Sequence, residues 1–152
     1  VGDKSSGAPR KSLTVLVCGG RDFVDRAWLD HVLRFIDRHP EHYGGHIGQI
    51  ISGAAPGADT LAKEWAEGCG IPYKAFPADW ETHGRAAGPI RNQQMLEEGK
   101  PDLVIAFPGG RGTADMVRRA RAAGIKVAHV IKRPSLLRRW WWPPLPYWEM
   151  LG

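Results

Sequence analysis

The sequence has no long apolar run and only two cysteines. Its uninterrupted hydrophobic stretches, such as residues 103–107, are far shorter than the roughly 20 residues of a membrane-spanning helix. Residues 1–12 are polar and lack the apolar centre of a signal peptide, so we expect a cytoplasmic protein without membrane contact. Cys18 and Cys69 are too few for a disulfide framework, and neither is part of a CxxC pair. Cys18 lies in an apolar run and is expected to be buried, with a redox role as the alternative.

The middle of the chain also lacks a net charge of either sign. Residues 12–131 contain 14 Lys or Arg and 14 Asp or Glu, so the net charge of +5 comes from the two ends. A nucleic-acid-binding domain usually carries a basic stripe on its folded body. DNA is therefore disfavoured as a partner, and the pI of about 9.5 reflects the ends of the chain.

Short apolar stretches alternate with helical patterns along this middle part. Strands are expected at residues 13–18, 47–52, 72–78, 102–107 and 126–131, and helices at 25–39, 59–68, 89–98 and 113–123. Asp59 or Thr60 is expected to cap the second helix, and Thr113 the last. The alternation predicts one α/β domain over residues 13–131, with a mostly parallel sheet of about five strands between two layers of helices. Right-handed crossovers then bring every strand-to-helix loop to one edge of the sheet, where such proteins bind ligands.

The two ends differ from this domain. Residues 1–12 are expected to form a flexible N-terminal tail. Residues 132–152 form a tail rich in tryptophan and proline, which contains four of the seven tryptophans. Exposed aromatic residues are typical of docking surfaces. Docking on a partner, folding back on the tail's own domain and contact within a homodimer remain three open interpretations.

Three glycine-containing loops follow three of the expected strands, at residues 19–22, 53–59 and 108–113. Glycine lets the backbone approach a ligand, and the free N–H groups at the start of the next helix favour an anion such as phosphate. A single loop of this kind often only turns the chain, but three on one sheet edge favour a binding site. The loop at 53–59 lacks the lysine of a P-loop, and the loop at 19–22 is not a GxGxxG turn.

Four ordered motifs resemble one known family. They are VCGGRDF at 17–23, SGAAPGAD at 52–59, DW at 79–80 with GPIRN at 88–92, and PGGRGT at 108–113. Together they are similar to the YspA/cpYpsA-related family of the SLOG superfamily, which also includes cytokinin-activating phosphoribohydrolases and the DNA-processing protein DprA. The resemblance covers about residues 13–131 and implies a Rossmann-like domain that senses or processes a nucleotide or nucleotide-derived small molecule. It also implies self-association, because SLOG relatives often form homodimers.

The loops and the resemblance together suggest roles for individual residues. The amides of Gly110, Gly112 and Thr113 would hold a phosphate, and Arg91 would pair with that group or a second one. Asn92 would fix its neighbouring loop or contact a base or ribose. The expected ligand-binding residues are Gly19, Gly20, Arg21, Asp22, Gly53, Gly57, Asp59, Arg91, Asn92, Gly109, Gly110, Arg111, Gly112 and Thr113. For Arg91 the alternative is a surface charge or salt bridge, for Asp59 a helix cap, and for Arg21 a role within its own loop.

Catalysis is the second hypothesis. The phosphoribohydrolases cleave the base–ribose bond of nucleoside 5′-monophosphates, and the resemblance implies a glutamate in the pattern PGGxGTxxE together with an upstream arginine. Here Arg91 resembles that arginine, but the glutamate position is Met116, which cannot transfer a proton. The acids Asp22 and Asp59, with Arg91, are the catalytic candidates. Binding without turnover is therefore the leading interpretation.

Histidine and tryptophan residues leave further alternatives open. His39, His42 and His46 surround a predicted turn, but their spacing matches no zinc motif, so we expect a solvated loop and no metal. No cofactor is expected. Trp80 stacks on a base or packs in the core, and His83 lines the pocket or lies on the surface.

Overall fold

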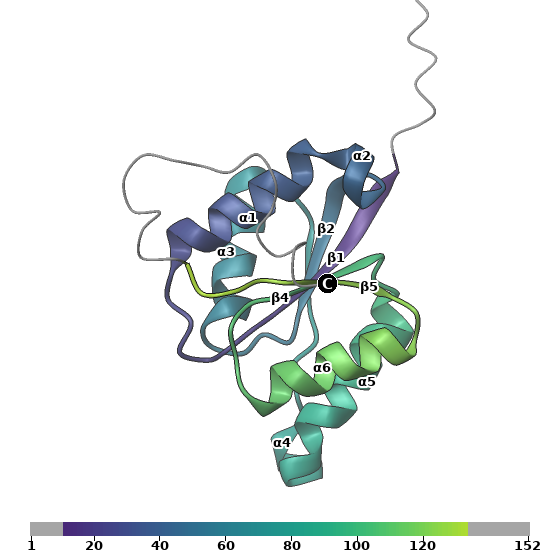
Figure 1. The fold of residues 1–152 in the computed structure, drawn as a ribbon. Helices are drawn as coiled ribbons and strands as arrows, with labels where there is room; N and C mark the ends of the chain where they lie inside the picture. Colours follow the sequence, from purple (N-terminus) through teal and green to yellow (C-terminus); the bar gives the residue numbers. More distant parts are fainter. Residues whose placement is uncertain (1–10, 134–152) are drawn as a thin grey trace, which may run out of the picture.

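Strand β1 (Ser12–Cys18) lies at the centre of a five-stranded sheet in the computed structural model, which describes residues 11–133 (Figure 1). The strand order is β3-β2-β1-β4-β5, and every neighbouring pair is parallel. The other strands are β2 (His46–Ser52), β3 (Tyr73–Ala75), β4 (Leu103–Ala106) and β5 (Lys126–His129). The predicted α/β class and parallel sheet are confirmed, and the strand order is new information from the structure.

Helices cover both faces of this sheet (Figure 1). On one face lie α1 (Arg26–Arg38) and α3 (Ala58–Cys69), and on the other α5 (Ala87–Gly99) and α6 (Arg111–Ala122). Short segments precede or follow them: α2 (Pro40–Tyr43), α4 (Trp80–His83) and the 3₁₀ turn η1 (Gly84–Ala86). The three-layer arrangement agrees with the prediction. No helix within residues 11–133 is long and apolar enough to cross a membrane.

The side chains of β1 alternate between two hydrophobic clusters. Val15 and Val17 pack under α1 and α3, whereas Leu16 and Cys18 pack under α5 and α6. A strand buried on both faces needs apolar residues on both of them. Residues 13–18 therefore do not alternate between polar and apolar side chains. Burial of Cys18 is confirmed, and burial also raises the pKa of its thiol, which therefore stays protonated. A protonated, buried thiol argues against the redox alternative.

The structure corrects the predicted starts of two helices. Helix α3 begins at Ala58 with Gly57 as its N-cap, and α6 begins at Arg111 with Gly110 as its N-cap; neither end has a side-chain cap. Glycine at these positions lets the backbone enter the helix earlier than the polar residues suggested. Asp59 and Thr113 thus lie inside the first helical turn and are free of the capping role assigned to them.

Three further expectations need adjustment. The third strand has only three residues, and the short helices α2 and α4 were not predicted. Ser12 belongs to β1, so the tail expected at residues 1–12 ends before it. Most of that tail and the tryptophan-rich segment 134–152 lie outside the described residues, and so do the docking interpretations attached to them.

Candidate functional site

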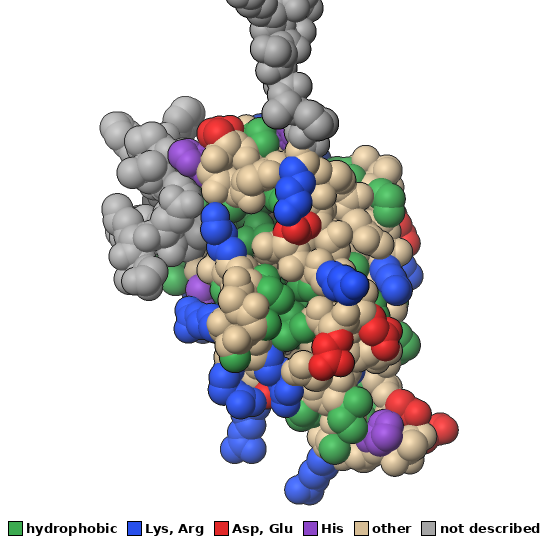
Figure 2. All heavy atoms as spheres, turned by 90° about the vertical axis from the view of Figure 1, so that its right-hand side faces the viewer, with side chains coloured by type: hydrophobic (Ala, Val, Ile, Leu, Met, Phe, Trp, Pro, Cys, Tyr) green, Lys and Arg blue, Asp and Glu red, His purple; other side chains and the backbone are tan. Residues whose placement is uncertain are grey.

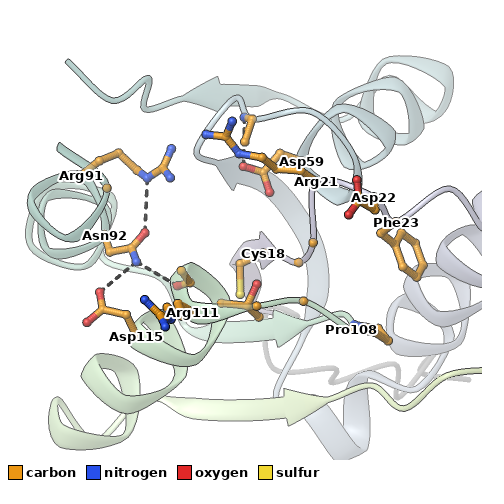
Figure 3. A pocket seen from close by; sticks show the side chains of 18 of the residues that line it. Cys18, Arg21, Asp22, Phe23, Asp59, Arg91, Asn92, Pro108, Arg111 and Asp115 are labelled. Atoms are coloured by element: carbon orange, nitrogen blue, oxygen red, sulfur yellow. Dashed lines mark hydrogen bonds between the residues drawn. The ribbon is translucent and has the colours of Figure 1, made fainter. Parts of the chain in front are cut away.

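A cleft of about 1220 Å³ lies at the carboxyl ends of the strands, where the predicted loops meet. Its walls come from the loops after β1 and β4, from residues of α3 and α5, and from the first turn of α6 (Figure 3). It is lined by twelve of the predicted ligand-binding residues: Gly19, Gly20, Arg21, Asp22, Asp59, Arg91, Asn92, Gly109, Gly110, Arg111, Gly112 and Thr113. The topology thus places residues from distant parts of the sequence around one cavity.

Gly53 and Gly57 were also predicted to bind a ligand, but neither of them lines the cleft. At Gly57, φ is +83° and a Cβ atom would overlap the carbonyl oxygen of Gly20. The next amide, that of Ala58, donates to the same oxygen at 3.3 Å. Gly57 therefore lets the second loop pack directly on the first, which is a structural role.

The first turn of α6 presents its backbone to the cleft. Gly110 and Gly112 have no atom within 4 Å of the position a Cβ would take, so open space lies beside them. Gly109 is different, because a Cβ there would overlap the hydroxyl oxygen of the buried Thr113 and crowd the Gly20 amide. No side chain caps this 12-residue helix, so its first N–H groups are available to an anion.

Arg91 reaches across the cleft from α5 to the second loop. Its Nη1 donates to the carbonyl oxygen of Gly53 at 2.5 Å and, at 3.5 Å, to that of Phe76. Burial lowers the pKa of this guanidinium. The negative charge of Asp59 acts to raise that pKa again, and the positive charge of Arg21 lowers it further. Two guanidinium groups and one carboxylate therefore act on this part of the cleft, and the balance of charge is positive and suits an anionic ligand.

Asn92 joins α5 to α6. The buried amide donates to the carboxylate of Asp115 at 3.0 Å and to the carbonyl of Gly112 at 3.1 Å, and its oxygen accepts from Arg91 Nε at 3.3 Å (Figure 3). The fixing role predicted for Asn92 agrees with these bonds.

Asp115 is held by several donors. Besides Asn92, it accepts from Arg119 at 2.8 Å and from Arg118. Burial acts to raise the pKa of Asp115, but the hydrogen bonds from Arg119, Asn92 and Arg118 hold it below the usual range. Asp115 is thus an ionised structural acid.

Asp59 is the one buried carboxylate of the cleft among residues 11–133. Only 5% of it is exposed, and it accepts from the Ala55 amide at 3.2 Å. Burial raises its pKa to about 6, although backbone hydrogen bonds from Ala55 and Gly53 and the charges of Arg91 and Arg21 oppose the shift. Asp59 therefore changes protonation state near neutral pH, which a simple surface cap would not do. Asp22, the other acid candidate, is exposed at the mouth of the cleft.

The structure adds cleft residues that the sequence analysis did not select. They are Cys18, Phe23, Val24, Asp25, Trp28, Ala55, Arg85, Gly88, Pro89, Met95, Pro108, Asp115, Lys132 and Arg133. Arg85, Lys132 and Arg133 add positive charge to the walls, and Arg133 lies 3.9 Å from Asp25. Within residues 11–133, the cations Arg21, Arg85, Arg111 and Lys132 have no acidic partner within ion-pair distance. The signal available in the sequence was their position, with Arg85 shortly before the motif at 88–92 and Lys132 and Arg133 directly after the last expected strand.

The open alternatives for Trp80 and His83 are decided in part. Trp80 lines the cleft with 48% of its surface exposed, so the interpretation as a core residue is wrong. His83 is exposed on α4 and does not line the cleft, which agrees with surface placement. The glutamate position of the resemblance, Met116, is completely buried between α6 and the sheet.

The histidine segment is more ordered than predicted. Residues 40–43 form α2, and His39 and His46 are half-buried. Nδ1 of His39 is hydrogen-bonded to the Phe35 carbonyl at 2.7 Å, and Nδ1 of His46 to the Asp37 carbonyl at 2.8 Å. The expected solvated loop is therefore wrong. No group of three or more His, Cys, Asp or Glu in residues 11–133 is arranged to hold a metal ion.

Comparison with known proteins places the chain in a family. The sequence model of the YspA, cpYpsA-related SLOG family matches residues 13–83. The Gene 61 protein of Mycobacterium phage D29 is 37% identical over 127 residues, which cover 79% of this chain and 98% of that protein.

Solved structures share the fold at low sequence identity. DNA processing protein A (DprA) from Streptococcus pneumoniae has a TM-score of 0.61 at 19% identity, over 84% of this chain and 53% of that one. The Moco carrier protein from Chlamydomonas reinhardtii has a TM-score of 0.56 at 19% identity, over 79% and 76% of the two chains. With the Rossmann-like fold, the matching family model and the phage relative in agreement, the chain belongs to the YspA, cpYpsA-related SLOG family.

Proposed function

We propose that the cleft binds a nucleotide or nucleotide-derived small molecule, with a phosphate on the first turn of α6. The observation that carries this proposal is the uncapped start of α6, where Gly110 and Gly112 leave open space beside free backbone N–H groups. Neither glycine has a side chain between these N–H groups and an anion that approaches the helix. The loops after β1 and β4 shape the remaining walls of the same cavity.

The charges of the cleft support an anionic ligand. Six basic side chains and four acidic ones line it. Three of the acids are already engaged: Asp115 with two arginines, Asp59 with backbone amides, and Asp25 as the cap of α1 through the Trp28 amide at 3.0 Å. The unpaired cations would raise the local concentration of phosphate-bearing molecules and hold them once bound.

Related folds point to small ligands as well as to nucleic acid. The Chlamydomonas protein is named as a carrier of Moco, and the Streptococcus protein as a DNA-processing protein. Figure 2 shows one face of this molecule, on which several Lys and Arg side chains gather at the lower left and others lie beside Asp and Glu. The neutral body of the chain as a whole supports a small phosphate-bearing ligand over a DNA duplex.

Hydrolysis of the ligand is the second candidate function, and the buried acid Asp59 favours it. A carboxyl group with a pKa of about 6 can donate a proton to a leaving base near neutral pH and accept one from water in the following step. Met116, at the position of the family's glutamate, supplies no such group. A ligand that binds and returns intact would make the chain a sensor or carrier, and release of the free base would make it a hydrolase.

Position 110 offers a sharp test of the phosphate site. Gly110→Asp places a carboxylate where the phosphate would bind, yet Asp is a favoured N-cap residue and meets no atom there, so the fold should be kept or slightly stabilised. Gly110→Ser is the matched control, because serine is an equally good cap without the charge. The ligands are nucleoside mono- and diphosphates, ADP-ribose and cyclic nucleotides, screened by thermal shift and measured by calorimetry.

We expect at least one of these ligands to stabilise the wild type. Gly110→Asp should weaken that ligand at least tenfold, whereas Gly110→Ser should stay within a few-fold of the wild type. Mass spectrometry of the recovered ligand separates binding from hydrolysis. Unchanged affinity in Gly110→Asp would overturn the proposed phosphate site. The predicted homodimer is checked on the same samples by light scattering.

A further inference from the structure

Trp80 is the most conspicuous exposed aromatic residue of the described chain. It is the first residue of α4, has 48% of its surface exposed, and lines the cleft. The only other large hydrophobic side chains exposed within residues 11–133 are Val24 and Ile90. Burying an indole inside the protein would remove far more apolar surface from water than this arrangement does. Its position in the wall of the cleft leaves this apolar surface available to a ligand.

The backbone around Trp80 fixes where the ring lies. The carboxylate of Asp79 accepts from the Thr82 amide at 3.0 Å, which caps α4, and Gly84 ends the helix with φ of +53°. One edge of the indole rests near Gly88 of α5, where a Cβ atom would be 3.5 Å from the ring. Trp80 is thus in contact with α5 at one edge of its ring and forms part of the wall of the cleft.

The guanidinium of Arg21 lies over that ring. Its guanidinium carbon is 5.7 Å from the indole centroid, a cation–π arrangement at an exposed site. Arg21 belongs to the exposed loop after β1 and has no acidic partner within ion-pair distance in residues 11–133, so only this cation–π contact and the more distant charge of Asp59 attract its guanidinium. A planar heteroaromatic ring stacks on tryptophan more strongly than an exposed guanidinium does.

We propose that Trp80 is the stacking surface for the base of the nucleotide, and that the base takes the place of the Arg21 guanidinium on the indole ring. The inference rests on the proposed function, since it assigns the base of the same ligand whose phosphate lies on α6. Trp80 would then be the residue by which the cleft distinguishes nucleotides from phosphate esters that lack a base. Because stacking tolerates any base, it recognises the class of heteroaromatic bases without choosing among them.

The test compares ligands with and without a base. Adenosine, guanosine and uridine 5′-monophosphates and the base-free ribose 5-phosphate are titrated by calorimetry into the full chain. The proteins are the wild type, Trp80→Phe, Trp80→Ala and Ile90→Ala. Ile90 is the matched control, because it is 45% exposed on α5 and does not line the cleft. Trp80 is itself half exposed, so its removal leaves the core intact.

We expect the wild type and Ile90→Ala to bind at least one monophosphate roughly tenfold more tightly than ribose 5-phosphate. Trp80→Ala should reduce this preference to about twofold or less without changing the affinity for ribose 5-phosphate, and Trp80→Phe should keep most of it. A preference retained in Trp80→Ala, or a wild type that binds ribose 5-phosphate as tightly as every nucleotide, would overturn the stacking role alone. Binding of none of the four ligands would overturn the assignment of Trp80, and if the nucleoside diphosphates, ADP-ribose and cyclic nucleotides of the thermal-shift screen also fail to bind, the proposed function is overturned together with it.

Discussion

The Arg91 guanidinium occupies the space that a side chain on Gly53 would fill. Nη1 donates to the Gly53 carbonyl at 2.5 Å, and a Cβ atom on Gly53 would overlap that nitrogen. Gly53→Ala should therefore push the flexible end of Arg91 away and leave two carbonyl groups without their charged donor. We expect a loss of about 1–3 kcal/mol in the free energy of unfolding, measured by urea denaturation.

A double-mutant cycle identifies the cause of that loss. In the Arg91→Ala background the same Gly53→Ala change should cost much less, because the guanidinium is already absent. Gly68→Ala is the control, since Gly68 lies in α3 with open space around it. This substitution should raise the free energy of unfolding by about 0.5–1 kcal/mol. Equal costs of Gly53→Ala in both backgrounds would show that the fit with Arg91 is not the reason.

A second prediction concerns the link between α5 and α6. Asn92→Asp replaces the amide donor by a second carboxylate 3.0 Å from Asp115 and leaves the Gly112 carbonyl without its partner. We expect a loss of roughly 2 kcal/mol at pH 7, partly restored by Asp115→Asn in the same chain. The carboxylate pair raises the folded-state pKa of one acid, so the penalty should shrink as the pH falls toward 4. A penalty that does not depend on pH would point to lost packing instead.

The sequence predicts the cleft well because local chemistry determines it. Residues 13–18 have apolar side chains at both odd and even positions, as a central parallel strand requires. The glycine loops at 19–22 and 108–113 follow β1 and β4, which are paired neighbours in the sheet. Right-handed crossovers then bring both loops to the same sheet edge without any knowledge of strand order.

Other features depend on contacts that no local pattern encodes. Arg91 and Gly53 are 38 positions apart, and their fit follows from the packing of α5 against the end of β2. The capping prediction for Asp59 failed because Gly57 starts the helix earlier, and burial then gives this acid its raised pKa. Trp80 reaches the cleft from the four-residue helix α4, which is too short to show a periodic hydrophobic pattern in the sequence.

A third prediction follows from the protonation of Asp59. Burial raises its pKa from the usual 3.8 to about 6, so the folded chain keeps a proton that the unfolded chain releases. The stability contributed by this group is complete below about pH 4 and is lost as the pH rises through 6. Asp59→Asn should therefore stabilise the protein by about 1–3 kcal/mol at pH 7.5 and change it little at pH 4, as measured by urea denaturation. A gain of the same size at both pH values would contradict the assigned pKa.

The same titration should control anion binding. Protonation of Asp59 removes the negative charge that faces Arg91 and Arg21, so an anion meets two uncompensated guanidinium groups. Sulfate keeps its double charge across this range and is the suitable probe. We expect the wild type to bind sulfate several-fold more tightly at pH 5 than at pH 7.5, and Asp59→Asn to lose most of that difference. A persistent pH dependence in Asp59→Asn would assign it to another group.

The last prediction concerns the family's glutamate position. Met116 is completely buried and packs with Leu16 and Val104 against the sheet, so Met116→Glu would place a carboxylate in the hydrophobic core. We expect the free energy of unfolding to fall by more than about 3 kcal/mol at pH 7, whereas the volume-conserving Met116→Leu should cost less than about 1.5 kcal/mol. Met116→Glu should also release no free base from nucleoside 5′-monophosphates, because its side chain would point away from the cleft. A stable Met116→Glu protein that hydrolyses a monophosphate would show instead that α6 can turn this position toward the ligand, and that a single substitution separates binding from catalysis in this chain.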